Sequence, residues 1–289
     1  MEDVALVKVS KFGFKNVIIK SNRLFKKMLD YISLYKSYFN MVLRSEMQYK
    51  KAFIVSIFSQ IASSLTSLIA IYFMFSKFGN VDGFTFNDVL ICYSISFFGF
   101  STTECFFRGF DHFDEILSSG RFDIILTKPR NLLFQIIGEI IEIKKLGRAL
   151  LALIVLALVF AHNPILWSAE KVLAIVLMVL GTVIIYSGLF VVRAGICFYT
   201  TNSLEIMNIF TDGARDLTEY PLSIYHKAVK GFFTYVIPLA LVNLYPLLYL
   251  IGKSDNKWYI FLPCLTIFFV IPCLLFWKIG LKKYKSVGS

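Results

Sequence analysis

Three histidines are the first residues to consider for chemistry, because an imidazole can act as a general base or bind a metal. They are His112, His162 and His226, which lie far apart in the sequence and form no HExxH motif. Only His112 has acids beside it, Asp111 and Asp114. The solvated polar face of a short helix explains that group better than catalysis, so we predict no catalytic residue.

Five cysteines are the next candidates for chemistry: Cys92, Cys105, Cys197, Cys264 and Cys273. They lie in or beside apolar stretches, and their spacings fit neither a disulfide framework nor a metal site. We therefore predict a packing role for them, and no metal. The chain also has no GxxxxGK[ST] phosphate loop, so we predict that it holds no ATP or other cofactor itself. Any energy from ATP has to come from another polypeptide.

A cluster of charges at residues 205–219 is the most unusual polar feature, because the stretch around it is rich in apolar residues. One lone charge at the centre of a membrane helix costs about 2.5–3.5 kcal/mol. Arg215 is three residues from Asp212 and four from Glu219, so both pairs can meet on one helix face. The residues predicted to line a substrate path or a subunit contact are Glu205, Asn208, Asp212 and Arg215. The alternative is that the charges only satisfy one another, or lie on a solvated helix.

The elements that hold these residues are membrane spans. A crossing needs roughly 20 apolar residues. Uncharged stretches of this size occur at 52–75, 172–192 and 258–277, and 89–107 contains one acid, Glu104. A shorter span over 149–161 is expected to begin near Ile143, with Lys144, Lys145 and Arg148 reaching out to the interface. The composition agrees, with 57% hydrophobic and only 17% charged residues.

The positions of the positive charges predict the orientation. Residues 1–51 carry eleven Lys and Arg against four acids, 108–148 carry seven more, and the tail adds Lys278, Lys282, Lys283 and Lys285. The connections 76–88, 162–171 and 252–257 together hold only four, Lys77, Lys171, Lys253 and Lys257. The positive-inside rule therefore puts both termini and 108–148 in the cytoplasm. No pattern for nucleic-acid recognition accompanies the net charge of +11, so we predict no nucleic-acid partner.

The N-terminal region precedes the first span. Apolar residues recur at helical spacing over 24–47, which predicts an amphipathic helix lying in the cytoplasmic membrane interface. A small cytosolic helix packed on the bundle is the alternative. We divide the chain into a basic extension, 1–23, and a single membrane domain, 24–289.

The fifth crossing has two alternatives. Residues 234–251 are uncharged but contain Pro238 and Pro246, which kink or split a helix. Either 196–220 is cytoplasmic and 234–251 crosses, or 196–220 crosses and 232–251 is a re-entrant pair of half-helices. Both alternatives give six crossings.

Residues 108–133, RGFDHFDEILSSGRFDIILTKPRNLL, form a charged amphipathic segment between two spans. Phe110, Phe113 and Leu117 can share one helix face, and acids occupy another. Gly120 and Pro129 act as stops and predict a short knob whose two aromatic rings suit a cleft in a partner protein. The alternative is a loop resting on lipid headgroups. The candidate docking residues are Phe110, Asp111, Phe113, Asp114 and Glu115.

Four runs in this order resemble the permeases of ABC-type exporters, in the branch whose ATPase is a separate chain. They are RGFDHFDEILSSGRFDIILTKPRNLLFQIIG, SLEIMNIFTDGARDLTEYPLSIY, FFTYVIPLALVNLYPLLYLIG and the terminal YKSVGS. The resemblance covers roughly residues 30–289. It implies an all-α integral membrane protein with an interfacial helix, six spans, a cytoplasmic coupling helix between the second and third spans, and a re-entrant element before the last span, with YPLSIY at the turn. That favours the second alternative for the fifth crossing.

The resemblance also implies a function. The chain is expected to be a transport subunit and not an enzyme, and to export an apolar or amphipathic cargo across the cell membrane by alternating access. Its expected partners are two copies of an ABC ATPase, a second permease in a homodimer or heterodimer, and membrane lipid. The candidates of the 205–219 cluster then lie on the substrate path or between the permease halves. A stand-alone membrane enzyme or channel remains the alternative.

Overall fold

The computed structural model describes residues 26, 29–162, 168–200 and 205–286, so the extension 1–23 lies outside the described residues. No strand occurs within these ranges, and the regular structure there is helical. The chain divides into two units, Met1–Tyr49 and Lys50–Ser289, and each is described by itself. In the first unit residues 29–46 form a helix, followed by the 3₁₀ turn η1 (Met47–Tyr49). This confirms a helix in the predicted amphipathic stretch.

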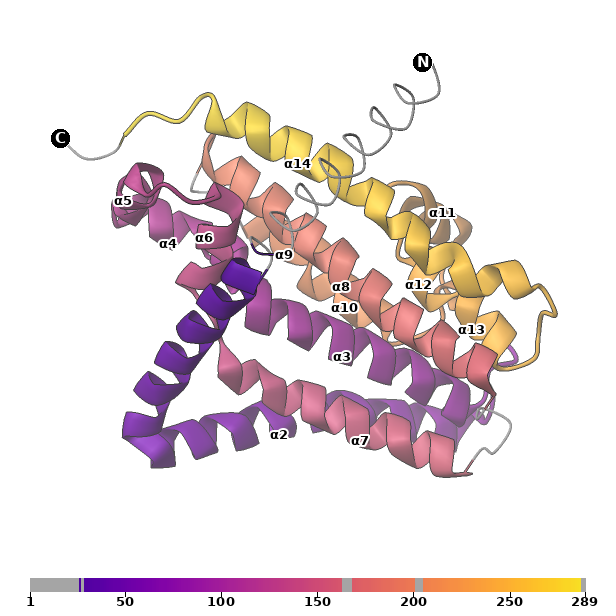
Figure 1. Cartoon of the computed structure of the whole chain (residues 1–289). Coiled ribbons are helices and arrows are strands. Elements are labelled where there is room, and N and C mark those ends of the chain that lie inside the picture. The colour runs from indigo at the N-terminus through magenta and orange to yellow at the C-terminus, as the bar shows by residue number, and fades with distance from the viewer. Residues whose placement is uncertain (1–25, 27–28, 163–167, 201–204, 287–289) are drawn as a thin grey trace, which may run out of the picture. The chain divides into compact units, whose positions relative to one another are not determined.

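The second unit is built from long helices that run side by side (Figure 1). They are α2 (Lys50–Phe78), α3 (Phe86–Asp111), α7 (Leu146–His162), α8 (Ala169–Cys197) and the 3₁₀ helix η5 (Lys257–Thr266), which leads into α14 (Ile267–Leu281). Four described helical stretches, containing α2, α3, α8 and η5–α14, are long and apolar enough to cross a membrane. The predicted spans are thus confirmed as helices. In the bundle α3 packs between α7 and α8, and α8 also packs against α14.

At one end of this unit, connections predicted to be external lie together. Lys253 Nζ donates to the carbonyl oxygen of Gly83 at 2.7 Å. Lys171 Nζ donates to the carbonyl oxygen of Leu250 at 2.8 Å. Lys257 Nζ pairs with Glu170 at 2.7 Å. We call this the outer end. The grouping agrees with the predicted topology, and the side of the membrane on which it lies stays a prediction.

The predicted coupling segment lies at the opposite end, the inner end, where Figure 1 shows it beside the last turn of α14. It folds into α4 (Phe113–Ser118), α5 (Arg121–Thr127) and α6 (Leu132–Glu139). Gly120 joins α4 to α5 with φ 69°, a left-handed conformation that favours glycine. Pro129 follows the end of α5. The prediction of a short knob delimited by these two residues is confirmed.

The chain between α8 and η5 is broken into short pieces. They are α9 (Glu205–Phe210), α10 (Asp212–Thr218), η4 (Leu222–Ile224), α11 (Lys227–Tyr235), α12 (Ala240–Asn243) and α13 (Tyr245–Leu250). The YPLSIY motif forms the turn around η4. The chain bends by 93° between α11 and the helices that follow, at the break that contains Pro238.

The contacts of these pieces show their path. Asn208 in α9 reaches Arg193 near the inner end of α8, at 2.6 Å. Arg215 in α10 lies midway along α3, over the rings of Phe97 and Phe100. The chain then turns back, because the ring of Phe232 in α11 lies 6.0 Å from that of Phe210. Finally α13 ends at the outer end.

The helical lengths in this region bear on the two alternatives for the fifth crossing. The helices α9 and α10 span about 21 Å together and residues 240–250 about 16 Å, at 1.5 Å per residue. A hydrocarbon core is about 30 Å thick. Neither helical stretch reaches this thickness alone, and the chain passes from the inner to the outer end through both, with the 93° bend between them. The choice between the two alternatives stays a prediction.

Candidate functional site

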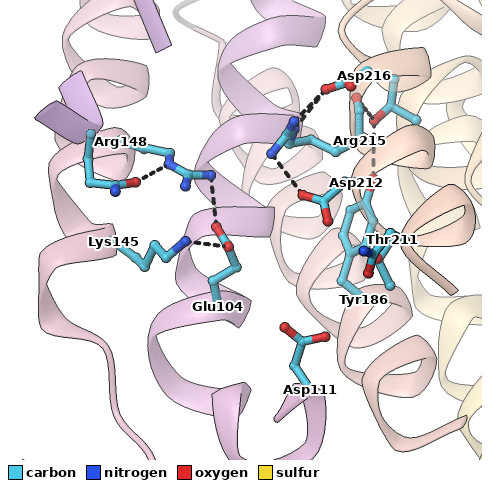
Figure 2. A network of polar contacts seen from close by, with 12 residues as sticks. Glu104, Asp111, Lys145, Arg148, Tyr186, Thr211, Asp212, Arg215 and Asp216 are labelled. Carbon is cyan, nitrogen blue, oxygen red and sulfur yellow. Dashed lines mark hydrogen bonds and ion pairs between the residues drawn. The ribbon is translucent and has the colours of Figure 1, made fainter. Parts of the chain in front are cut away.

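A carboxylate buried inside the bundle is the centre of the polar site. Glu104 of α3 is 3% exposed and faces three cations. Lys145 Nζ donates to it at 2.8 Å and Arg148 at 3.1 Å, while Arg108 lies at 3.4 Å. Figure 2 shows Lys145 and Arg148 converging on Glu104. Because a buried charge needs partners, this group fixes α3 to the start of α7.

The positions of Lys145 and Arg148 correct the sequence prediction. Both side chains point inward and not toward the lipid interface: their exposed fractions are 10% and 13%. Arg148 also donates to Gln60 of α2 at 2.5 Å, which ties a third helix into the group. The sequence showed a lone acid in one span and two bases at the start of the next, but not that they meet.

A second set of charges continues from this group toward the coupling segment. Asp111, the last residue of α3, is 4% exposed and pairs with Arg108 and with Arg193 of α8. Arg108 also pairs with Glu142 at 3.4 Å. The prediction placed Asp111 on a solvated face, which is wrong. Its ion pairs make it an internal link between α3 and α8.

The predicted cluster on α10 is present, with one change of partner. Arg215 lies 3.2 Å from Asp212, as predicted, and 2.6 Å from Asp216 (Figure 2). Glu219 forms no ion pair with it, because Glu219 lies one residue past the end of α10 at Thr218, where its side chain is buried. The guanidinium carbon lies 5.4 Å and 5.1 Å from the ring centres of Phe97 and Phe100.

The predicted site residues differ in how much of each side chain is exposed. The Asp212 side chain is 50% exposed and that of Asp216 is 59% exposed, whereas Arg215 is 17% exposed. Glu205 is exposed at the first residue of α9. Asn208 accepts a hydrogen bond from Arg193, so the structure links this candidate to Asp111 through one arginine. Carboxylates with accessible oxygens therefore lie midway along the bundle.

Two residues that sequence reasoning missed hold the broken segment in place. Asn243 of α12 is 3% exposed; its amide donates to the carbonyl oxygen of Thr218 at 2.8 Å and accepts from the Leu222 nitrogen at 3.2 Å. Ser96 of α3 donates to the same Thr218 oxygen at 2.8 Å. Irregular backbone at membrane depth is tolerated only when its polar groups find partners. These side chains supply them at the YPLSIY turn.

The aromatic residues of the coupling segment are buried inside this chain. Phe113 is 0% exposed, and its ring centre lies 4.9 Å from that of Trp277, 5.0 Å from Phe122 and 5.3 Å from Phe198. Phe110, 2% exposed, packs against Trp277 at 5.6 Å. The two rings are not available to a partner, which corrects the prediction that they enter a partner's cleft. They fix the segment to α8 and α14.

The exposed surface of the segment lies on α5 and its following loop. Ile124 is 60% exposed and Leu126 is 45% exposed, while Phe122 and Ile125 of the same helix are buried. Glu115 is exposed on α4 and forms a 2.7 Å contact with His112. The sequence indicated an exposed apolar surface here, because FDIIL contains more apolar residues than fit on the one buried face of a seven-residue helix.

Long apolar helices with charges buried among them indicate a multi-pass membrane protein. The sequence model of the ABC-2 family transporter protein matches residues 61–288, and the chain belongs to this family. It is therefore the permease component of an ABC transporter and not a catalytic enzyme, and permeases of this family typically work with an ABC ATPase. Comparisons with curated proteins and with solved structures gave no match.

Proposed function

We propose that this chain is the permease subunit of an ATP-driven exporter that moves an apolar or amphipathic cargo out of the cytoplasm by alternating access. The observation that carries the proposal is the placement of Asp212 and Asp216. Half or more of each side chain is exposed, level with Phe97 and Phe100 in the middle of α3. The surface around them is the path of the cargo.

The surroundings of the Asp212 and Asp216 carboxylates follow from the cost of placing a charge in lipid. A carboxylate in hydrocarbon costs several kcal/mol, and ionisable residues within spans face a bundle interior or a water-filled route. Lipid tails therefore do not cover Asp212 and Asp216. Water does, in a route closed on its other side by a second permease subunit, either a second copy of this chain or a related one.

We infer six crossings. Helices α2, α3, α7 and α8 supply four, the broken segment 205–250 supplies the fifth and η5–α14 the sixth. With the positive charges inside, the inner end and both termini lie in the cytoplasm and the outer end faces outward across the cell membrane. The helix at 29–46 lies in the cytoplasmic interface.

The ATPase acts on the permease at the inner end. Two ATPase chains bind the transporter, one at each coupling segment, and their closure on ATP displaces the segment. The contact surface is the exposed part of α5, with Ile124 and Leu126 at its centre and the predicted residues Asp114 and Glu115 at its edge. Phe110 and Phe113 do not belong to this surface; they are buried and pack the segment against Trp277 of α14.

Accessibility of the carboxylate positions tests the path. In a background without the five native cysteines, Asp216→Cys should react with a charged methanethiosulfonate reagent added to membranes. Leu180→Cys is the matched control, because Leu180 lies in the middle of α8 and is 52% exposed, but on an apolar surface. We expect fast modification of the first and none of the second. Equal protection of both would place Asp216 against lipid or protein and remove the path.

A further inference from the structure

The C-terminal motif YKSVGS has no role in the function proposed so far, yet its described residues make specific contacts. Tyr284 and Ser286 follow the end of α14. The Tyr284 hydroxyl donates to Asp123 Oδ1 at 2.9 Å, and the Ser286 hydroxyl donates to Asp123 Oδ2 at 2.7 Å. Asp123 lies in the first turn of α5. Both oxygens of one carboxylate in the coupling segment are thus bound by the tail, in hydrogen bonds strengthened by its charge.

The ring of Tyr284 adds an apolar contact to the same helix. Its centre lies 4.9 Å from that of Phe122, the neighbour of Asp123, in an edge-on arrangement. It also lies 5.9 Å from Phe198, which follows α8. Because Phe122 is fully buried, the tail contacts the fixed side of α5, while Ile124 and Leu126 stay exposed on the other side.

These contacts give the coupling segment a second connection to the bundle. The first is covalent, because α4 begins two residues after the end of α3. The second runs from Asp123 through the tail to α14. Within α14, Trp277 also packs against Phe113, so α14 meets the segment at two levels. A displacement of α5 is therefore transmitted to two spans, α3 and α14.

We propose that Asp123 is a positioning residue that fastens the C-terminal tail to the coupling segment, so that α5 and α14 move as one body during transport. This inference rests on the proposed function. Asp123 needs no contact with cargo or ATP for this role. It acts through Tyr284 and Ser286.

Removal of the two hydroxyls tests the connection without disturbing the packed rings. The variant Tyr284→Phe/Ser286→Ala keeps the ring on Phe122 and loses both hydrogen bonds. The matched control is Tyr249→Phe, whose hydroxyl donates to Glu170 at 2.6 Å at the outer end. The readout is the change in the rate of Asp216→Cys modification when ATP is added to membranes that contain the transporter. We expect that change to fall at least ~5-fold in the tail variant, with ATPase co-purification unchanged and the control unaffected.

Cross-linking tests the claim of one body. Asp123→Cys/Ser286→Cys, in the background without native cysteines, should lose the ATP-dependent change as the tail variant does. A disulfide between these two cysteines, formed by mild oxidation and verified by mass spectrometry, leaves the Asp216→Cys thiol free for the readout and should restore the change. Failure to cross-link, or a cross-link that abolishes the ATP-dependent change, would overturn the inference. If the parent with its tail intact shows no ATP-dependent change at all, the proposed function fails instead, so the two failures are distinguishable.

Discussion

At the scale of single residues, burial decides what each charge does. Glu104 is enclosed by cations from α3 and from the start of α7, so its carboxylate organises the inner half of the bundle. Asp212 and Asp216 keep much of their surface accessible although they flank a largely buried arginine. A carboxylate thus joins helices in one place and keeps an accessible surface, on the proposed path, in the other.

Glu104→Gln should strongly destabilise the protein, because it leaves Lys145, Arg148 and Arg108 buried without their shared anion. Removing one partner of a buried ion pair costs about 3–5 kcal/mol. The thermal unfolding midpoint of the detergent-purified protein measures this loss. Glu170→Gln, which breaks an exposed pair with Lys257, is the control and should leave the midpoint unchanged. Equal midpoints for both variants would contradict the role of Glu104.

The partner of Arg215 can be identified by rescue. Arg215→Ala removes a cation from two aromatic faces and should cost about 2 kcal/mol. Adding Asp216→Asn should recover part of the loss, since the unpaired acid is removed, whereas adding Glu219→Gln should not. Unfolding of the single and double variants measures the difference. Rescue by Glu219→Gln alone would restore the pairing expected from sequence spacing.

Sequence spacing named Asp212 correctly and Glu219 incorrectly as partners of Arg215, for a local reason. The i,i+4 rule applies within a helix, and α10 ends at Thr218, so Glu219 lies outside the helix and the adjacent Asp216 pairs with Arg215 instead. The inward course of Lys145 and Arg148 was also missed. Proximity to a span end does not reveal that an acid 41 residues earlier lies within hydrogen-bond reach.

At the scale of elements, the long helices were predictable and the broken segment was not. Uncharged stretches gave α2, α3, α8 and η5–α14, because length and apolarity are sufficient for a span. The path of 205–250 depends on Asn243 and Ser96, which supply the turn with hydrogen-bond partners from other elements. No local pattern shows such contacts. Likewise, an amphipathic segment shows that one face is apolar, but not whether its own chain or a partner covers it.

Docking of the ATPase should depend on the exposed side of α5. Ile124→Asp should leave the fold intact, since Ile124 is 60% exposed, and should reduce the ATP hydrolysis that co-purifies with the permease. A loss of about 2 kcal/mol, typical of an interface hot spot, corresponds to roughly 30-fold weaker binding. Asn80→Asp adds the same charge at the outer end and is the control.

The Phe113→Ala variant distinguishes a packing role of this buried ring from a role in binding the ATPase. This buried ring should cost about 3–5 kcal/mol of stability when truncated, so the variant should unfold at lower temperature even without the ATPase. A normal midpoint for Phe113→Ala with selective loss of the ATPase would show that the ring contacts the partner after all.

At the scale of the whole molecule, the charge distribution sets the orientation. Asn80→Cys and Asp255→Cys, both at exposed positions of the outer end, should react with an impermeant maleimide on intact cells. Lys128→Cys, exposed in the loop after α5, should react only after the cells are permeabilised. Labelling of Lys128→Cys alone in intact cells would reverse the topology.

The two ends of the bundle are fastened by different kinds of contact, and the ionic strength of the medium distinguishes them. At the outer end the pair of Lys257 and Glu170 has 69% and 51% of its side chains exposed, so dissolved salt screens it. At the inner end Glu104 and Lys145 are only 3% and 10% exposed, and screening reaches them poorly. Raising the salt concentration should therefore weaken the Lys257–Glu170 pair more than the ion pairs of Glu104.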